Sequence, residues 1–204
     1  PFRSRDLDTF DNISVKEALK HPNWDMGEKI SIDSATMMNK CLEVIEAYWL
    51  FQLNPKKIDI VIHPQSIVHS MVEFNDGSIK AQMGVPDMKV PIQYALTFPS
   101  HSKSPWEKLD FLSCGDLTFQ APDYDRFPSL QLAYQALKNG GTASAALNLS
   151  NDYSVQKFLE KKIIFTDIYK INYFSLQNHP WIKHPSLNDL RNLDDWVKNH
   201  VNEF

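Results

Sequence analysis

Between residues 36 and 50, apolar and polar side chains recur with the period of a helix. At about 100° of rotation per residue, four apolar positions share one narrow arc: Met38, Leu42, Ile45 and Trp49. Three polar positions share a second arc, about a quarter turn away: Asn39, Glu43 and Glu46. The pattern predicts an amphipathic helix from about Thr36, whose apolar arc faces a core.

The stretch after this helix predicts β-structure. β-branched residues dominate residues 58–62, and two further apolar runs cover residues 67–74 and 79–83. Asp76-Gly77 lies between the last two runs, and an Asp-Gly pair in that position is a strong hairpin signal. We expect a mixed sheet, covered on one side by the apolar arc of the helix.

Further helices are predicted on both sides of these elements. Ser14 and Glu17 have the spacing of a capping box, so a short helix should run to Lys20 and stop before Pro22. Residues 86–98 suggest a second helix, which runs through Ile92 to Phe98 and has Pro91 in its first turn. Prolines then interrupt residues 99–123, which we interpret as a linker.

The last part of the chain has a helical pattern throughout. Amphipathic segments lie near residues 130–137, 153–161, 167–176 and 186–201, and Gly140-Gly141 ends the first of them. Short connections between such segments indicate a small bundle. We see no titratable cluster in it, so we expect it to brace the rest of the chain. Three polar residues in this part are interpreted as caps and turns: Asn148, Asn151 and Asp152.

These elements together predict an α+β fold, in which a mixed sheet covered by helices is followed by a small C-terminal helical bundle. We place one domain over residues 1–98, a linker over residues 99–123 and a helical domain over residues 124–204. A chain of 204 residues with 43% hydrophobic content can bury a core of this size.

Charge and composition exclude several classes of protein. The net charge of −4 provides no basic surface for nucleic acid or for an anionic membrane. Cys41 and Cys114 are far apart, which suits a reduced cytosolic protein better than a disulfide framework. No apolar run approaches the roughly 20 residues of a membrane span, and no signal peptide or glycine-rich nucleotide motif is present.

Candidate chemistry gathers where the first predicted helix begins. The hydroxyls of Ser34 and Thr36, the free backbone N–H groups and the positive end of the helix dipole could together bind a phosphate group. Lys40 lies beside Glu43, which offers a carboxylate to a hard divalent cation. Alternatively, these residues form an ordinary solvated face in which Lys40 and Glu43 make a weak ion pair.

A loop before this helix has the composition of a lid. Trp24, Met26 and Gly27 combine a large aromatic ring, a flexible thioether and a glycine in a polar context. The alternative is a packing loop in which Trp24 fills an apolar gap. His63 and His69 do not have the spacing of a metal site, so we expect hydrogen-bonded structural histidines.

Four motifs of the chain resemble those of one family, in the same order and with the same spacing. They are His21-Pro-Asn-Trp-Asp-Met-Gly27, the stretch over residues 29–50, Ile62-His-Pro-Gln-Ser66 and Pro86-Asp-Met88. The chain is similar to the second half of the 1-deoxy-D-xylulose 5-phosphate reductoisomerase family, from its first residue to about Ile168. Beyond that point only the helical pattern is similar.

The resemblance implies an enzyme of isoprenoid biosynthesis by the non-mevalonate pathway. Members of the family rearrange the carbon skeleton of 1-deoxy-D-xylulose 5-phosphate and reduce the resulting aldehyde with NADPH to 2-C-methyl-D-erythritol 4-phosphate. They also use a divalent cation, for which carboxylate and water ligands suit magnesium, manganese or cobalt. By the same resemblance we expect a homodimer in the bacterial cytoplasm, or in a plastid-type organelle of a eukaryote, with the strand over residues 67–74 as a possible surface.

The resemblance also implies roles for individual residues. Ser34, Asn39 and Lys40 would hold the phosphate or the sugar hydroxyls, with His21 near the phosphate. Glu43 would be a metal ligand that also contacts substrate, and Glu46 would tune the site. The predicted lid would place Trp24 and Met26 over the sugar and the backbone of Gly27 near the nicotinamide nucleotide. Of these residues, His21, Lys40 and Glu43 would take part in catalysis.

The family pattern places an NADPH-binding domain and an Asp-x-Glu metal motif before the point where this chain opens with Pro-Phe-Arg. We therefore expect a part of a longer enzyme that is inactive alone. Cys41 departs from the family, in which we expect glycine, and its size puts close helix packing in question.

Two other hypotheses stay open. One is a non-catalytic module that binds a sugar phosphate or a partner. The other is a metal-dependent phosphohydrolase, which is disfavoured because no second carboxylate is spaced to share a metal with Glu43 and no nucleophile lies beside a base. A dinucleotide-binding pattern and an Asp-x-Glu motif upstream would decide for the reductoisomerase.

Overall fold

The computed structural model describes residues 1–20 and 26–204. The chain divides into two compact units: unit 1 contains Pro1–Ile60 and Pro122–Phe204, and unit 2 contains Val61–Ala121. Unit 1 is helical and unit 2 holds a β-hairpin, which confirms the α+β class. The predicted limits at residues 98 and 124 separate functional domains, whereas these two units are defined by compactness, so the predicted limits stay a prediction.

Unit 1 begins with a 3-10 helix, η1 (Leu7–Asn12), and a one-turn helix, α1 (Val15–Ala18). The predicted capping box starts α1. The backbone N–H of Ser14 donates to Glu17 Oε2 at 2.9 Å, and the N–H of Glu17 donates to Ser14 Oγ at 3.2 Å. These two bonds satisfy backbone donors that the first turn of a helix leaves free.

Two helices follow the lid segment, α2 (Glu28–Ala35) and α3 (Met38–Phe51). The helix predicted from about Thr36 is α3, which begins at Met38. Met37 separates the two helices because it adopts the left-handed conformation, with φ of 60°. No glycine or proline marks this break, so the sequence pattern did not reveal it.

The buried face of α3 packs on α5 (Ser129–Asn139). Its buried side chains are Met38, Cys41, Val44 and Ile45, and they share a core with Leu132, Ala133 and Ala136. Trp49, which we expected in the core, is 67% exposed, so that prediction is wrong. The apolar face of α3, which we expected to cover a sheet, packs on α5 instead. An apolar arc in the sequence predicts that a helix face is buried but does not identify the element that buries it.

The segment over residues 58–62, predicted as a strand, is an extended connection. Ile62 forms an isolated bridge with Gln120, and the carbonyl oxygen of Ile58 accepts a hydrogen bond from Tyr134 Oη at 2.9 Å. Ile58 and Ile60 pack against the core of unit 1. The described residues therefore contain a two-stranded antiparallel sheet and not the predicted mixed sheet, because this β-branched segment is used for side-chain packing.

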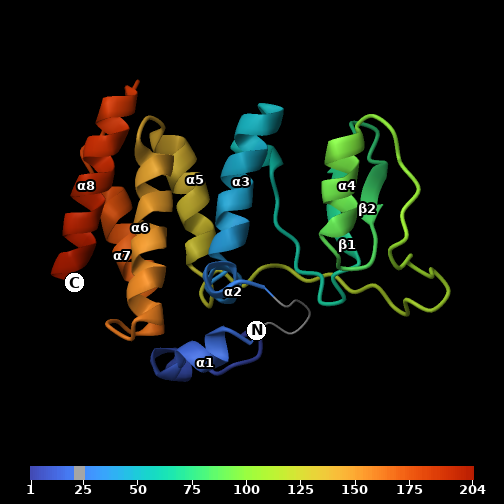
Figure 1. Ribbon diagram of the computed structural model, residues 1–204, viewed down its shortest axis with the longest axis horizontal. Coiled ribbons are helices and arrows are strands. Elements are labelled where there is room, and N and C mark those ends of the chain that lie inside the picture. The colour runs from blue at the N-terminus through green and yellow to red at the C-terminus, as the bar shows by residue number, and fades with distance from the viewer. Residues whose placement is uncertain (21–25) are drawn as a thin grey trace. The chain divides into compact units, whose positions relative to one another are not determined.

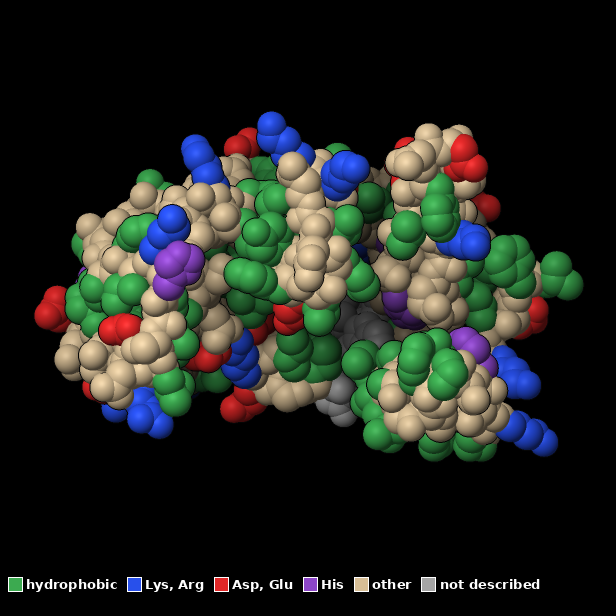
Figure 2. Space-filling view, turned by 90° about the horizontal axis from the view of Figure 1, so that it is seen from above, with side chains coloured by type: hydrophobic (Ala, Val, Ile, Leu, Met, Phe, Trp, Pro, Cys, Tyr) green, Lys and Arg blue, Asp and Glu red, His purple; other side chains and the backbone are tan. Residues whose placement is uncertain are grey.

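Unit 2 contains β1 (Val68–Glu73), β2 (Ile79–Met83) and α4 (Lys89–Thr97). The strands pair antiparallel, as the hairpin signal predicts, and Gly77 lies in the turn with φ of 81°. Pro91 lies in the first turn of α4, also as predicted. Most side chains of these three elements are exposed, and apolar groups cover much of this unit's surface at the right of Figure 2.

The second part of unit 1 is the predicted bundle. It contains α5, α6 (Ala143–Leu159), α7 (Phe165–Asn178) and α8 (Leu187–Glu203). Figure 1 shows α6 between α5 and α8, and its most extensive packing is on α7. Within the described residues, no helix is long and apolar enough to cross a membrane.

Helix α6 begins at Ala143, ten residues before the predicted start at Tyr153. Asn148, Asn151 and Asp152 therefore lie inside a helix, so their interpretation as caps and turns is wrong. Asparagine and serine are poor helix formers because their side chains compete for backbone hydrogen bonds. Burial overrides that preference here, since α6 packs on α2, α3, α5, α7 and α8.

The connection between α5 and α6 requires glycine. Gly140 and Gly141 end α5 as predicted, with φ of 63° and 54°. A Cβ atom on Gly141 would lie 2.3 Å from the carbonyl oxygen of Ile182, which is closer than any side chain can approach. That same carbonyl accepts a hydrogen bond from the N–H of Thr142 at 3.0 Å, so the turn is held against the segment before α8.

Candidate functional site

The connection from α2 to α3 carries the predicted anion-binding hydroxyls. Ser34 lies in the last turn of α2 rather than at the start of the next helix, which corrects the prediction. Thr36 Oγ1 donates to the carbonyl oxygen of Ile32 at 3.0 Å and accepts from the N–H of Met38 at 3.3 Å. The Thr36 hydroxyl is thus used within the protein, whereas Ser34 is half-buried and has no side-chain partner among the described residues.

The first turn of α3 presents Asn39 beside this connection. Asn39 is half-buried, and its Oδ1 atom is inaccessible to solvent without a hydrogen-bond donor in the described part of the chain. A buried acceptor without a donor costs roughly 1–3 kcal/mol. Such an atom needs an explanation, and a ligand hydroxyl is one that would supply the missing donor.

Lys40 and Glu43 form an ion pair on the exposed side of α3. Lys40 Nζ lies 2.8 Å from Glu43 Oε1 and 2.7 Å from Oε2, with side chains 41% and 51% exposed. This is the pair that the solvated-face alternative predicts. Exposed pairs of this kind contribute at most about 1 kcal/mol, so a phosphate and a cation could replace it at low cost.

The described residues do not contain a complete metal site. No group of three or more metal-ligating side chains is found in residues 1–20 and 26–204. Glu43 supplies one carboxylate, and Glu46, one turn further along α3, is exposed. A hard divalent cation binds protein through one or two carboxylates with water and substrate oxygens, so Glu43 fits as one ligand of an incomplete set.

The predicted lid lies partly outside the described residues. His21 and Trp24 belong to residues 21–25, of which the structure describes nothing. Met26 is half-buried, and Gly27 is the exposed N-cap of α2. Among the described residues other than its two chain neighbours, no atom lies within 4 Å of the position that a Gly27 Cβ would occupy, so they leave this backbone open to a ligand.

His63 and His69 belong to no metal-binding cluster among the described residues. His63 Nδ1 hydrogen-bonds the carbonyl oxygen of Thr118 at 2.8 Å, and its ring stacks on Phe119 with centroids 4.7 Å apart. The bond confirms that His63 is hydrogen-bonded, as predicted, while its Nε2 atom is buried without a partner among the described residues. His69 is exposed on β1.

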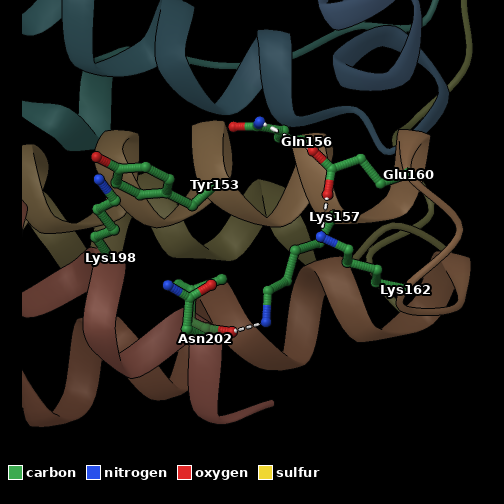
Figure 3. Close-up of a pocket in the computed structure, with 8 residues that line it drawn as sticks. Tyr153, Gln156, Lys157, Glu160, Lys162, Lys198 and Asn202 are labelled. Carbon is green, nitrogen blue, oxygen red and sulfur yellow. Dashed lines mark hydrogen bonds and ion pairs between the residues drawn. The ribbon is translucent and has the colours of Figure 1, made fainter.

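A hollow of about 180 Å³ lies between α6 and α8 and contains none of the predicted site residues. Figure 3 shows that two of its basic groups are already engaged, since Lys157 Nζ donates to the carbonyl oxygen of Val201 and Lys162 pairs with Glu160 at 2.6 Å, whereas Lys198 is exposed. Its other lining residues are Tyr153, Gln156, Lys198 and Asn202. This hollow offers no unpaired buried group that would select a ligand.

One feature beside the site was missed from the sequence. Asp33, adjacent to Ser34, is 2% exposed and accepts a hydrogen bond from Asn151 Nδ2 at 2.8 Å. The spacing of Lys29 and Asp33 on one helix was a usable signal for their ion pair. The contact with Asn151 spans more than a hundred residues, so no local pattern could have indicated it.

Comparison with known proteins gives a consistent result over the whole chain. A family model described as the DXP reductoisomerase C-terminal domain matches residues 83–200. A second, described as the 1-deoxy-D-xylulose 5-phosphate reductoisomerase C-terminal domain, matches residues 1–51.

Individual relatives carry the same description. The chain is 50% identical over 204 residues to 1-deoxy-D-xylulose 5-phosphate reductoisomerase of Acetivibrio thermocellus, covering 100% of the chain and 54% of the relative. It is 51% identical over 201 residues to that of Chloroherpeton thalassium, covering 98% and 52%. The chain thus spans about half the length of the curated relatives it matches.

Solved structures agree in fold. The reductoisomerase of Zymomonas mobilis in complex with NADPH has a TM-score of 0.91 and 45% identity, covering 100% of this chain and 52% of that one. A DOX-P reductoisomerase in complex with NADPH, fosmidomycin and magnesium has a TM-score of 0.93 and 44% identity, covering 99% and 52%.

Proposed function

Because the chain belongs to the 1-deoxy-D-xylulose 5-phosphate reductoisomerase family, we propose that it is part of an enzyme that makes 2-C-methyl-D-erythritol 4-phosphate. The enzyme rearranges 1-deoxy-D-xylulose 5-phosphate and then reduces the resulting aldehyde with NADPH. Residues 1–98 would belong to the catalytic domain, residues 99–123 to a linker and residues 124–204 to a helical domain. The proposed location is the bacterial cytoplasm, or a plastid-type organelle in a eukaryote.

The start of α3 supports this proposal most directly. Asn39 presents a buried oxygen that finds no donor in the described part of the chain, and Lys40 follows it with an exposed ammonium group. A sugar phosphate supplies hydroxyl donors for the first and an anion for the second, and charge-assisted contacts of this kind are the strong ones. Ser34, with a hydroxyl that has no side-chain partner in the described chain, would add a third contact.

We assign Glu43 as one ligand of the divalent cation. Relatives have been solved in complex with magnesium. The remaining ligands would come from the part of those relatives that this chain does not span. A bound divalent cation polarises substrate oxygens. When substrate and metal bind, the Lys40–Glu43 ion pair would separate. Lys40 would then bind the phosphate and Glu43 the cation, so each keeps an oppositely charged partner.

The lid residues complete the proposed site. NADPH is present in two of the solved relatives, and the open backbone at Gly27 would lie near its nicotinamide nucleotide. Met26 and Trp24 would cover the sugar and His21 would contact the phosphate end, with His21 and Trp24 outside the described residues. A closed lid excludes water while a reactive aldehyde awaits reduction. The 204-residue chain alone would be inactive.

We also propose that the protein is a homodimer through the hairpin of unit 2. Val72 on β1 and Ile79 on β2 are 58% and 59% exposed. They pair with Lys80 and Glu73 across the two-stranded sheet. These pairings place Val72 and Ile79 on opposite faces of the sheet. Exposed apolar side chains on a small sheet are typical of an interface, because a second copy can pair with a free strand edge and bury such side chains.

Replacing Lys40 in the complete enzyme tests the phosphate assignment. Lys40→Ala should raise the KM for 1-deoxy-D-xylulose 5-phosphate with little change in kcat, since the phosphate is bound equally in the ground state and the transition state. Lys56→Ala, which removes an exposed lysine of η2, is the matched control and should leave KM unchanged. A fall in kcat alone would contradict the phosphate role.

Replacing Glu43 tests the metal assignment. Glu43→Gln in the complete enzyme should abolish metal-dependent turnover and leave NADPH binding intact, because it removes a charged metal ligand and touches no predicted cofactor contact. Glu107→Gln, an exposed glutamate of unit 2, serves as the control. An active Glu43→Gln enzyme would refute the assignment.

A further inference from the structure

A chain of polar contacts joins α2, which carries Ser34 of the proposed site, to helix α6 of the bundle. Asp33 is 2% exposed, and its two oxygens are held from different helices. Lys29 Nζ, on α2 itself, lies 2.6 Å from Oδ2, and Asn151 Nδ2, on α6, donates to Oδ1 at 2.8 Å. Lys29 Nζ also lies 2.9 Å from Asp152 Oδ1, so the lysine bridges the two helices.

The contacts continue into α7. Asn172 Nδ2 donates to Asn151 Oδ1 at 3.1 Å, and Asn172 Oδ1 accepts from Ser150 Oγ at 3.0 Å. Asn151, Asn172 and Ser150 are fully buried. Both amide groups therefore have their donors and acceptors matched in a defined orientation, and α2, α6 and α7 are connected through side chains alone.

The energetics of this network favour one arrangement of the helices. A buried carboxylate is costly unless it is paired and hydrogen-bonded. Burial raises the pKa of Asp33, against the opposing hydrogen bonds from Lys29 and Asn151. Burial also disfavours the charge on Lys29, but its bonds to Asp33 and Asp152 outweigh this and raise its pKa. Displacing α2 would break these contacts together and leave buried polar groups without partners.

The network lies directly beside the residues assigned to the substrate. Ser34 follows Asp33 in the same helical turn, and consecutive helical residues point about 100° apart. Holding Asp33 against α6 therefore sets the direction of Ser34. The break at Met37 follows three residues later, and Asn39 and Lys40 lie in the first turn after it.

We propose that Lys29, Asp33 and Asn151 are positioning residues for the sugar-phosphate site, because they fix α2 and the α2–α3 connection against the helical bundle. This inference rests on the proposed function and extends it: the bundle, besides bracing the fold, sets the geometry of the substrate contacts through Asn151.

The test uses the complete enzyme with Asn151→Leu and Lys29→Met. Both variants should raise the KM for 1-deoxy-D-xylulose 5-phosphate roughly tenfold while kcat changes less than about twofold, because they misplace contacts made to the bound substrate. Lys29→Arg keeps the charge and can still bridge the two carboxylates, so it should restore most of the affinity.

A control variant separates positioning from a general loss of stability. Leu193→Ala removes a buried side chain of α8 from the apolar cluster in which α8 packs on Ala146 and Ile171. It should lower the melting temperature at least as much as Asn151→Leu and leave KM unchanged. A KM that rises equally in Leu193→Ala, or that stays unchanged in both network variants, would overturn the inference.

A second measurement is independent of turnover. Hydrogen exchange of residues 28–40 should be faster in Asn151→Leu than in Leu193→Ala at equal stability, because only the former frees α2. If the unaltered enzyme does not convert 1-deoxy-D-xylulose 5-phosphate, the proposed function fails and this exchange measurement still decides the positioning role. Equal exchange in the two variants would refute it.

Discussion

At the scale of single residues, the two cysteines illustrate how environment sets reactivity. Cys41, on the face of α3 that packs on α5, is fully buried in the same core as Ala133, so small neighbours accommodate the side chain where glycine was expected. Burial raises the pKa of the Cys41 thiol to about 12. Only the thiolate is a nucleophile, so Cys41 should be inert, whereas Cys114 is partly exposed.

We therefore expect one fast-reacting thiol per chain with Ellman's reagent at pH 8 under native conditions. Cys114→Ser should abolish the fast phase, and Cys41→Ala should leave it unchanged. Two thiols that react fast in the folded protein would contradict the burial of Cys41.

Glu17 links the stability of the N-terminal segment to pH. Hydrogen bonds from Ser14, and then from Arg5, lower the pKa of the Glu17 carboxyl from 4.5 to about 2. A lowered pKa in the folded state stabilises the fold above the unfolded value, and this contribution is lost as pH falls from about 4.5 to about 2.

Urea unfolding at a series of pH values tests this linkage. The unaltered protein should lose stability over that range more steeply than Glu17→Gln, which cannot titrate at this position. The exposed Glu107→Gln variant should follow the unaltered protein. Parallel curves for the unaltered protein and Glu17→Gln would show that the capping box does not depend on the charge.

At the scale of elements, α8 is the helix that its sequence specifies best. Ser186 caps it, accepting from the N–H of Asp189 at 3.2 Å, and Leu193, Val197 and Val201 form its buried stripe at intervals of four. The cap and the apolar stripe thus indicate the same helix, and such agreement between local signals makes a prediction from sequence reliable.

Removing this cap should have a measurable effect. Ser186→Ala should lower the free energy of unfolding by about 1 kcal/mol, since an N-cap hydroxyl satisfies a backbone donor in the first turn. Asn192→Ala, on the exposed side of α8, removes a polar side chain without a cap and should not destabilise the protein. Urea denaturation measures both, and equal stabilities for the two variants would contradict the role of the cap.

At the scale of the whole molecule, the two units differ in how much of their apolar surface is buried. Unit 1 contains almost all of the buried hydrophobic residues, with Ile67 as the exception in unit 2. A hairpin alone is marginally stable in water. Unit 2 therefore needs further burial, which the proposed dimer would provide.

Val72→Glu tests this requirement. A charge on the exposed face of β1 should disfavour association and shift the protein towards the monomer in sedimentation velocity experiments. Lys56→Glu, in unit 1, also introduces an acidic side chain at an exposed position and should leave the dimer intact. An unchanged dimer in Val72→Glu would place the interface elsewhere.

The sequence by itself determined the features that depend on neighbouring residues. These features are the capping boxes at Ser14 and Ser186, the hairpin turn at Gly77 and the end of α5 at Gly140. Each depends on contacts within a few residues, so a local sequence pattern is enough to predict it. The four motifs that resemble the family also identified the candidate residues at the start of α3.

Only the tertiary structure decided which partner covers each apolar or polar group. Packing on α5 buried Cys41 and left Trp49 exposed. Packing on the surrounding helices kept α6 helical through Asn151 in spite of its composition. The contact between Asn151 and Asp33 likewise exists only once the chain has folded. Burial and long-range hydrogen bonds depend on residues far apart in sequence, and their free energies exceed the local preferences by which helices and turns are predicted.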